Sequence, residues 1–407
     1  MIDPDCGILA SMPVSFGVVT LCAWMAVVGL AVLVRGRPFG TFAGIIVGLH
    51  SLIAAELAPM FQPIWPLFVA LHITVYLNFL LLLRPALRPW PVRVLINWPG
   101  SFFWGGTLLA MPWAVVRALG FTPWGVAIPY GLAVIGFLQS HATFPEELDL
   151  VVGDGDSAHP MPRPHRRGTF RQDRPLRIVQ ITDPHLGPFM SVGKLRRIAE
   201  DAVKRNPDLV LLTGDFLTME SQRSPEPLRR ALEPLKALRG RVFACHGNHD
   251  HEAPQLVRQA LEANEIHLLV DEAAIVDTEA GRVHILGMDF AWDRRAERMQ
   301  KVCDAHPRIP NTTRIVLLHD PGAFKHLPEG QADLVLSGHT HGGQVGLLSL
   351  GLPWTFLRLF GIRIPDHGFW ARGRDRMYVH RGTGHYGFPL RVGVPAEESL
   401  LRVHRAA

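Results

Sequence analysis

The chain has 407 residues, more than one domain usually holds, and 48% of them are hydrophobic against 19% that are charged. Its formal net charge of +5 suits anionic phosphates or lipid headgroups, and equally an ordinary solvated basic surface. The four cysteines, at positions 6, 22, 245 and 303, lie far apart without a Cys-x-x-Cys pair. This pattern excludes a disulfide framework and a zinc finger.

Charged residues are sparse up to about His141, and this part of the chain consists of long apolar runs. A membrane-spanning helix needs roughly 20 such residues. We therefore predict about five spans, with the lipid bilayer as a partner, at residues 12–34, 39–59, 64–83, 101–116 and 124–139. The last two runs are shorter and richer in glycine and proline, so four spans are the alternative. The acidic N-terminus and the several runs argue against a signal peptide.

Arginine-rich loops follow the first, third and fifth predicted spans, whereas the loops after the second and fourth carry at most one basic residue. By the positive-inside rule, five spans place the N-terminus outside and the C-terminal half in the cytoplasm. One span fewer would reverse this orientation. His50 and His72 lie within predicted spans, where a histidine is either functional or a neutral ring packed between helices.

A stretch from about residue 153 to residue 175 is rich in glycine, proline, arginine, aspartate and histidine and has no apolar period. Such a composition is typical of a linker. We predict a transmembrane domain at residues 1–145, a linker at 146–175 and a soluble domain at 176–407.

Five apolar, strand-like runs in the soluble half each end in polar residues, at 176–182, 208–213, 241–245, 314–318 and 334–337. Helical patterns separate them at residues 192–205, 225–238, 254–263 and 294–306. Further strands are predicted at 283–289, 377–381 and 399–404. The alternation predicts an α/β sheet, in which an active site gathers beyond the carboxyl ends of the strands.

The polar residues at these strand ends are oxygen and nitrogen ligands without a thiolate, which suits Mn²⁺, Fe or Zn²⁺. Two aspartates, one asparagine and four histidines are more ligands than one ion needs, so two ions about 3.5–4 Å apart are predicted. The candidates are Asp183, His185, Asp215, Asn248, His319, His339 and His341.

The ordered series Asp-x-His, Gly-Asp, Gly-Asn-His-Asp, His and Gly-His-x-His resembles the calcineurin-like metallophosphoesterase superfamily. The resemblance covers residues 176–404 and implies a β-sandwich flanked by helices, in four layers α/β/β/α, after the multi-span helical membrane domain. It implies a first metal on Asp183, His185 and His341, and a second on Asn248, His319 and His339. Asp215 would bridge both, and Mn²⁺ is the expected ion, with Fe or Zn²⁺ as alternatives.

His249 is not a metal ligand in this pattern, and we predict that it contacts a phosphate oxygen or the leaving-group oxygen. The neighbouring Asp250 is expected to fix the tautomer of His249 and raise its basicity. The predicted reaction is in-line attack of metal-bound hydroxide on a phosphodiester or pyrophosphate bond, with His249 as electrostatic partner or proton donor.

The stretch SGHTHGGQV and the C-terminal residues resemble the bacterial membrane-associated branch of the superfamily, similar to transmembrane metallophosphoesterases. The resemblance implies an inner-membrane enzyme acting on a lipid-linked substrate such as UDP-2,3-diacylglucosamine or a phospholipid. The apolar stretch 347–360, with Trp354 and Phe356, would line an acyl-chain groove or touch the bilayer, or it is ordinary core. Arg391 is a candidate phosphate contact or a structural arginine.

Two other functions are compatible with the sequence. One is a phosphodiesterase or phosphatase on soluble substrates with an incidental anchor. The other is a non-catalytic membrane sensor, against which the intact ligand set argues. No nucleic-acid partner is expected, and the sequence does not specify the exact substrate, the metal pair or the oligomeric state.

Overall fold

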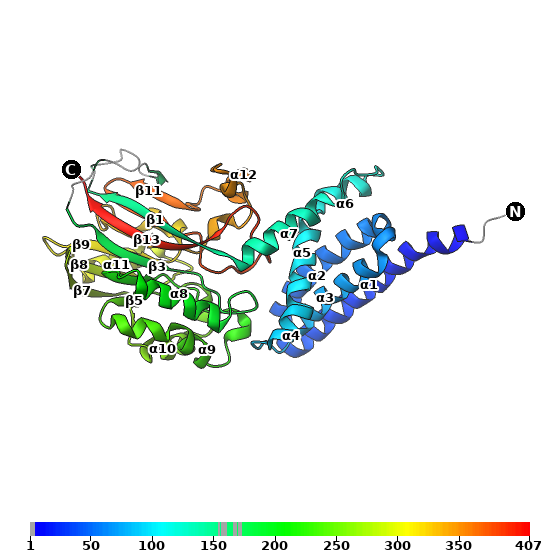
Figure 1. Ribbon diagram of the computed structural model, residues 1–407, viewed down its shortest axis with the longest axis horizontal. Coiled ribbons are helices and arrows are strands. Elements are labelled where there is room, and N and C mark those ends of the chain that lie inside the picture. The colour runs from blue at the N-terminus through cyan, green and yellow to red at the C-terminus, as the bar shows by residue number, and fades with distance from the viewer. Residues whose placement is uncertain (1–4, 154, 156–160, 166–168, 170–172) are drawn as a thin grey trace. The chain divides into compact units, whose positions relative to one another are not determined.

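The computed structural model describes residues 5–153, 155, 161–165, 169 and 173–407, and the chain divides into two compact units (Figure 1). Unit 1 comprises Met1–Leu138 and the short segment Gly387–Val392. Unit 2 comprises Gln139–Tyr386 and Gly393–Ala407. A segment near the C-terminus therefore folds with the N-terminal helices, which a prediction of consecutive domains did not anticipate.

Unit 1 is helical. Its elements are α1 (Asp5–Arg35), α2 (Arg37–Leu57), the 3-10 turn η1 (Ala58–Ile64), α3 (Trp65–Leu81), α4 (Trp90–Val92), the π-helical turn η2 (Arg93–Asn97), α5 (Trp98–Leu109), α6 (Met111–Ala118) and α7 (Ile128–His141).

Two stretches in the described part of the chain are long and apolar enough to cross a membrane, Phe16–Arg35 and Arg37–Leu81, the second covering α2, η1 and α3. The helices α5, α6 and α7 have 12, 8 and 14 residues, short of the roughly 20 that one crossing needs. Pro112 at the start of α6 cannot donate a backbone hydrogen bond, which accounts for the break after α5. The fourth and fifth predicted spans therefore stay predictions.

The first two helices pack closely because α2 carries glycines at a spacing of four, Gly40, Gly44 and Gly48. A Cβ atom at Gly48 would lie 2.8 Å from the ring of Trp24 on α1. The indole Nε1 of Trp24 donates a hydrogen bond to the carbonyl oxygen of Gly44 at 2.9 Å. Small residues that let two backbones approach are typical of helix pairs in membranes.

The two histidines predicted within spans are buried and hydrogen-bonded to each other. His50 Nε2 lies 3.1 Å from His72 Nδ1, and His72 Nε2 lies 3.0 Å from Thr20 Oγ1. The three residues come from α2, α3 and α1, so the rings connect three helices. This arrangement matches the alternative of neutral histidines packed between helices.

Unit 2 contains two mixed sheets. The six-stranded sheet has the order β1 (Thr143–Val152), β13 (Ala396–Arg405), β3 (Leu176–Ile181), β4 (Leu209–Leu212), β5 (Val242–Ala244) and β6 (His267–Leu268). The seven-stranded sheet has the order β2 (Arg163–Pro164), β11 (Gly368–Arg372), β12 (Asp375–Val379), β10 (Leu334–Ser337), β9 (Thr313–Leu318), β8 (Gly281–Met288) and β7 (Glu272–Thr278). Strands β3, β4, β5 and β6 are parallel to one another, as are β12, β10, β9 and β8.

The main core lies between the two sheets. Ile178 and Leu211 of the first sheet join Ile315 and Leu336 of the second in one buried cluster. Because side chains alternate along a strand, Val316 next to Ile315 faces the other side and joins a second buried cluster. That cluster includes residues of α11 (Arg295–Ala305).

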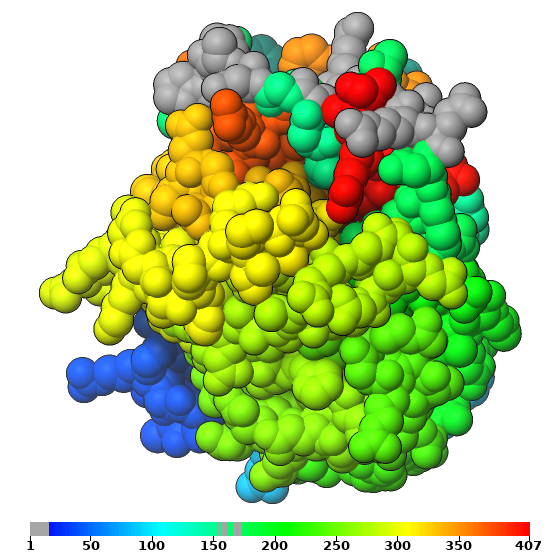
Figure 2. Space-filling view, turned by 90° about the vertical axis from the view of Figure 1, so that its left-hand side faces the viewer, coloured from blue at the N-terminus to red at the C-terminus, as the bar shows by residue number. Residues whose placement is uncertain are grey.

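The remaining helices are α8 (Val192–Lys204), α9 (Glu226–Leu232), α10 (Pro254–Glu262) and the single turn α12 (Phe356–Leu359). Ile198 and Ala202 of α8 face Val179 and Ile181 of β3. The chain from α9 to α11, green to yellow, forms most of the face seen in Figure 2. The predicted α/β domain is confirmed.

Strand β1 occupies residues 146–152 of the predicted linker, so the predicted linker begins too early. It pairs in parallel with β13 over ten residues, and Leu150 and Val152 are buried in the core between the sheets. An acidic side chain of this strand is paired with the neighbouring strand: Asp149 Oδ1 lies 2.9 Å from Arg402 Nε of β13. Much of the remaining linker lies outside the described residues.

The glycine contact between α1 and α2 yields a stability prediction. Gly48→Ala places a methyl group against Trp24 and should destabilise unit 1 by about 1–3 kcal/mol. The control is Gly29→Ala on α1, where no atom lies within 4 Å of a Cβ. That change should be neutral or stabilise by up to about 1 kcal/mol, because alanine favours a helix. Thermal unfolding in detergent compares the two, and equal melting temperatures would contradict the packing argument.

Candidate metal centre

The seven predicted ligands follow five strands drawn from both sheets. Asp183, Asp215 and Asn248 come after β3, β4 and β5 of the six-stranded sheet, whereas His319 and His339 come after β9 and β10 of the other. In each sheet these strands are parallel neighbours, so their carboxyl ends meet at one edge. The sandwich thereby brings ligands from both layers together.

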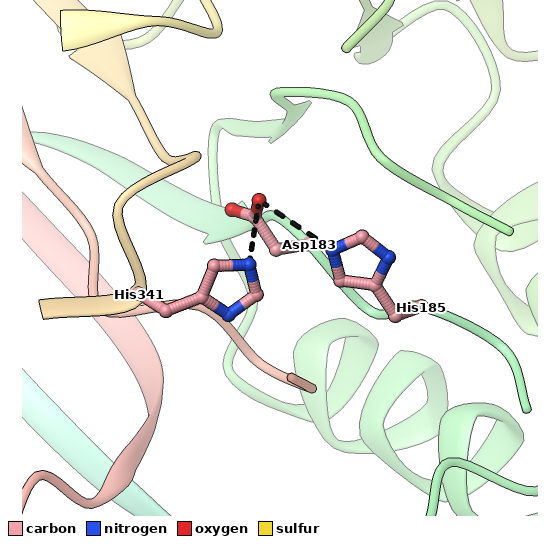
Figure 3. A group of neighbouring side chains, drawn as sticks. All are labelled: Asp183, His185 and His341. Atoms are coloured by element: carbon pink, nitrogen blue, oxygen red, sulfur yellow. Dashed lines mark ion pairs between the residues drawn. The ribbon is translucent and has the colours of Figure 1, made fainter. Parts of the chain in front are cut away.

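The first group is Asp183, His185 and His341, three buried side chains whose rings point toward one carboxylate (Figure 3). Nε2 of His341 lies 3.4 Å from Oδ1 of Asp183, and Nε2 of His185 lies 3.9 Å from the same oxygen. Metal–ligand bonds of about 2.0–2.2 Å leave ligand atoms about this far apart.

The second group is Asp215, His319 and His339, and Asp215 also lies close to His185 of the first group. Oδ2 of Asp215 lies 3.3 Å from Nε2 of His319 and 3.6 Å from Nε2 of His185. One carboxylate oxygen therefore faces an imidazole of each group. Asn248 is held next to it, because the backbone N–H of the following His249 donates to Oδ1 of Asp215 at 2.9 Å.

These ligand atoms fit divalent cations. Among the described residues, both ring nitrogens of His185, Nε2 of His319 and Oδ1 of Asn248 are buried and make no hydrogen bond. The other nitrogen of His319 donates to the carbonyl oxygen of Thr213 at 2.6 Å, so Nε2 is the atom that faces the carboxylates. Burial would lower the pKa of His319, but Asp215 and Asp183 outweigh it and raise that pKa to about 10, so a positive charge is favoured between Nε2 and the carboxylates. The residues present therefore match a two-cation site.

Electrostatics support the same interpretation. Burial alone would raise the pKa of Asp183, but the facing rings of His341, His319 and His185 outweigh it and hold that pKa well below the usual range. For Asp215, burial is likewise outweighed, by His319 and His185, and its pKa is lowered. Both carboxylates are thus kept ionised inside the protein, as metal ligands must be.

The backbone at the centre is unusual, because five of the seven ligands are non-glycine residues with positive φ. The angles are 50° at Asp183, 44° at His185, 57° at Asp215, 68° at His339 and 52° at His341. Each such conformation costs about 1–3 kcal/mol and is typical of functional sites. Hydrogen bonds hold it, for example from the N–H of His339 to the carboxylate of Asp183 at 3.0 Å. Sequence patterns carry no direct signal for this strain.

Two positions beside the ligands require glycine, because a ligand carboxylate lies too close to the backbone there for any side chain. A Cβ atom at Gly338 would lie 2.1 Å from Oδ2 of Asp183, and one at Gly247 would lie 2.2 Å from Oδ1 of Asp215. Any side chain at either position would collide with a ligand carboxylate. This explains the glycines of the Gly-Asn-His-Asp and Gly-His-x-His motifs in physical terms.

The partner predicted for His249 needs correction. Nδ1 of His249 lies 2.7 Å from Oε1 of Glu252, because the short helical turn η5 (His249–Glu252) puts residues three apart on one face. Burial would lower the pKa of His249, but the hydrogen bond with Glu252 and the negative charges of Asp215 and Glu252 together outweigh it and raise that pKa. Asp250 instead accepts backbone hydrogen bonds from Asp215, Phe216 and Gly247 at 2.8–2.9 Å.

Asp250 is therefore a structural support of the centre. Its burial, together with the charge of Asp215, raises its pKa to about 6. Its three backbone bonds fix the turn after β4 and the turn after β5 relative to each other. Sequence adjacency to His249 suggested the wrong partner, since consecutive residues of a helical turn point in different directions.

The predicted substrate residues are divided between the two units. Trp354 and Phe356 lie on the surface of unit 2, 49% and 45% exposed. Arg391 is fully buried and belongs to unit 1. Tyr386, which the sequence did not single out, stacks on His185 with ring centroids 5.1 Å apart and meets His249 edge-on at 5.0 Å.

A further cluster lies next to the centre, and its carboxylate is paired by basic side chains. Oδ1 of Asp289 lies 3.2 Å from Nδ1 of His246 and 3.0 Å from Nε2 of His251. Its other oxygen is 2.9 Å from the guanidinium of Arg298. These contacts pair the carboxylate completely without a cation.

Comparisons with known proteins agree with this geometry. Residues 176–343 match the model of the calcineurin-like phosphoesterase family, a range that contains all seven ligands. The metallophosphoesterase YkoQ of Bacillus subtilis is 30% identical over 242 residues, 56% of this chain and 83% of that protein. The phosphodiesterase YaeI of Escherichia coli is 28% identical over 250 residues, 59% of this chain and 86% of YaeI.

A third relative carries a more specific name. The UDP-2,3-diacylglucosamine pyrophosphatase LpxG of Chlamydia trachomatis is 26% identical over 287 residues, 56% of this chain and 83% of LpxG. The family match and the relatives agree with the ordered ligands and the two-sheet fold. The chain belongs to the calcineurin-like phosphoesterases and is a metal-dependent phosphoester hydrolase.

Proposed function

We propose that this chain is a membrane-anchored hydrolase that uses two divalent cations to cleave phosphodiester or pyrophosphate bonds of a lipid-linked substrate. The observation that carries the proposal is the shared oxygen of Asp215, 3.3 Å from a ring nitrogen of His319 and 3.6 Å from one of His185. A carboxylate between two sets of imidazoles suits a bridging ligand, and a bridged pair suits phosphoryl transfer.

In this proposal Asp183, His185 and His341 would hold the first cation, Asn248, His319 and His339 would hold the second, and Asp215 would contribute to both. Oxygen and imidazole ligands favour Mn²⁺, with Fe or Zn²⁺ as alternatives. When bound, such a pair polarises phosphoryl oxygens and makes water a nucleophile at neutral pH. The buried, ionised carboxylates and the directed ring of His319 hold the ligands ready.

His249 is the proposed proton donor to the leaving-group oxygen. It is only partly buried, and its Nδ1 is occupied by Glu252, so Nε2 remains to face a substrate. The raised pKa keeps more of the ring protonated near neutral pH, which suits a general acid. Glu252 thus takes the positioning role that we had predicted for Asp250.

Three observations support a lipid-linked substrate. Unit 1 contains two stretches able to cross a membrane by length and composition. The stretch after the His341 turn exposes large apolar side chains, among them Trp354 and Phe356. LpxG carries the name of a pyrophosphatase for a diacylated sugar nucleotide. Together with the arginine pattern of the predicted loops, they favour the bacterial inner membrane with the metal centre in the cytoplasm.

Metal content tests the ligand assignment. Chain purified with Mn²⁺ should hold two ions per molecule, and Asp215→Asn should lose at least one because the bridging charge is gone. Elemental analysis by mass spectrometry measures both. Asp277→Asn, an exposed carboxylate on β7, is the matched control and should keep two ions. A wild-type chain without metal, or an unchanged Asp215 variant, would overturn the dinuclear centre.

Substitution of His249 tests the proton donor. His249→Ala should lower kcat on bis-p-nitrophenyl phosphate by about 10²–10⁴-fold and leave the metal content unchanged. Glu252→Gln keeps a hydrogen bond to the ring and should cost less than Glu252→Ala. Full turnover by the His249 variant would refute the role.

The substrate class is tested by comparing substrates with one enzyme preparation. We expect kcat/KM on UDP-2,3-diacylglucosamine or a phospholipid in mixed micelles to exceed that on bis-p-nitrophenyl phosphate, because an acyl chain adds apolar contacts. Equal values on soluble and lipid substrates would favour the soluble-substrate alternative.

A further inference from the structure

The segment after the metal-ligand turn exposes an unusual number of large apolar side chains. We call residues 347–364 the apolar loop; it lies between η7 (His341–Gly343) and β11. Nine of its side chains are 39–73% exposed: Leu347, Leu350, Leu352, Trp354, Phe356, Leu359, Phe360, Ile362 and Ile364. Exposed apolar groups concentrated in one segment mark an interaction surface rather than ordinary surface variation.

Two polar side chains of this segment, Thr355 and Arg358, point the other way, toward the protein. The carboxylate of Asp366, which is fully buried, accepts hydrogen bonds from Thr355 Oγ1 at 2.6 Å and from Arg358 Nη2 at 2.8 Å. The backbone oxygen of Asp366 accepts from Thr340, between the two ligands of the Gly-His-x-His motif, at 2.7 Å. These two side chains are therefore held by a buried carboxylate, while nine large apolar side chains of the same segment are exposed.

Backbone hydrogen bonds also fix the loop. The N–H of Leu347 donates to the oxygen of Trp354 at 2.8 Å, and that of Phe356 donates to Val345 at 2.7 Å. Leu357 lies against the ligand turn, since a Cβ atom at Gly343 would be 3.3 Å from its Cγ. The apolar side chains are therefore displayed by an ordered scaffold that rests on the turn carrying His341.

We propose that the apolar loop is a bilayer-docking surface, whose aromatic and aliphatic side chains enter the boundary between headgroups and acyl chains. The proposal rests on the membrane anchoring in the proposed function, and it adds a second, interfacial attachment. Aromatic rings beside an exposed basic residue, here Arg363, suit the interface of an anionic membrane. A chain already tethered to the bilayer presents the loop to lipid at high effective concentration.

The docking surface explains how the centre meets a substrate that does not leave the membrane. The loop begins a few residues after His341 and contacts its turn, so its insertion holds the proposed metal site at headgroup level. Phosphoester bonds of lipid-linked substrates lie at that level.

A polarity-sensitive fluorophore on a single cysteine tests the docking. The full chain, with Cys6 and Cys22 replaced by serine, is labelled at Phe360→Cys and placed in nanodiscs. The control site is Ile275→Cys, 53% exposed on β7, the strand at the far edge of the seven-stranded sheet from β2 and β11. We expect blue-shifted emission that is quenched by brominated acyl chains at residue 360, and neither effect at residue 275.

Two outcomes would overturn the proposal. Emission at residue 360 equal to that at residue 275 would show that the loop stays in water. A blue shift without quenching by bromolipid would show that a protein, such as a second copy of this chain, covers it. Because the probe does not depend on turnover, either result is distinguishable from failure of the proposed hydrolase activity.

Activity supplies a second measurement. The double variant Leu359→Ser and Phe360→Ser should lower turnover of a lipid substrate embedded in vesicles and leave hydrolysis of bis-p-nitrophenyl phosphate unchanged. Ile275→Ser is the control and should change neither. Unchanged vesicle turnover in the double variant would count against docking by this loop.

Discussion

The structure of the catalytic unit depends on two buried carboxylates that must stay charged. Asp183 and Asp215 lie at the ends of adjacent parallel strands, without exposure to water that would solvate them. An unpaired buried charge costs several kcal/mol, so the fold has to supply positive charge at this place. Imidazoles from the second sheet supply part of it, and cations are the remaining partner that the unbonded ring nitrogens accept.

This constraint explains features that otherwise appear unrelated. The backbone is left-handed at five ligand positions, which brings the side chains inward. The surrounding hydrogen bonds stabilise this strained conformation. Glycine at 247 and 338 leaves space for the carboxylates. Asp250 is a third buried acid. Its carboxylate oxygens accept hydrogen bonds from three backbone N–H groups and so connect two of the turns that carry ligands. The site is thus built from main-chain geometry as much as from ligand identity.

The sequence proposed the ligands of the centre from local information: an apolar run that ends in a polar residue can be seen within ten residues. It missed three features, and two of them depend on contacts between distant segments. The predicted linker began at residue 146, although β1 extends to Val152, because the partner strand β13 lies some 250 residues away. Glu252 was missed because adjacency favoured Asp250, although a helical turn pairs residues three apart. Gly387–Val392 folds with unit 1, which no local pattern in that segment indicates.

The apolar loop adds a mechanical consequence to the chemistry. Asp366 holds Thr355 and Arg358 on one side and, through its backbone oxygen, Thr340 on the other. Thr340 stands between His339 and His341, one ligand of each metal group. The hydrogen bonds through Asp366, together with the packing of Leu357 on Gly343, therefore join the loop to the turn that carries both histidines. An environment that fixes the loop would also fix these histidines, so the proposed docking surface and the proposed metal ligands share one support.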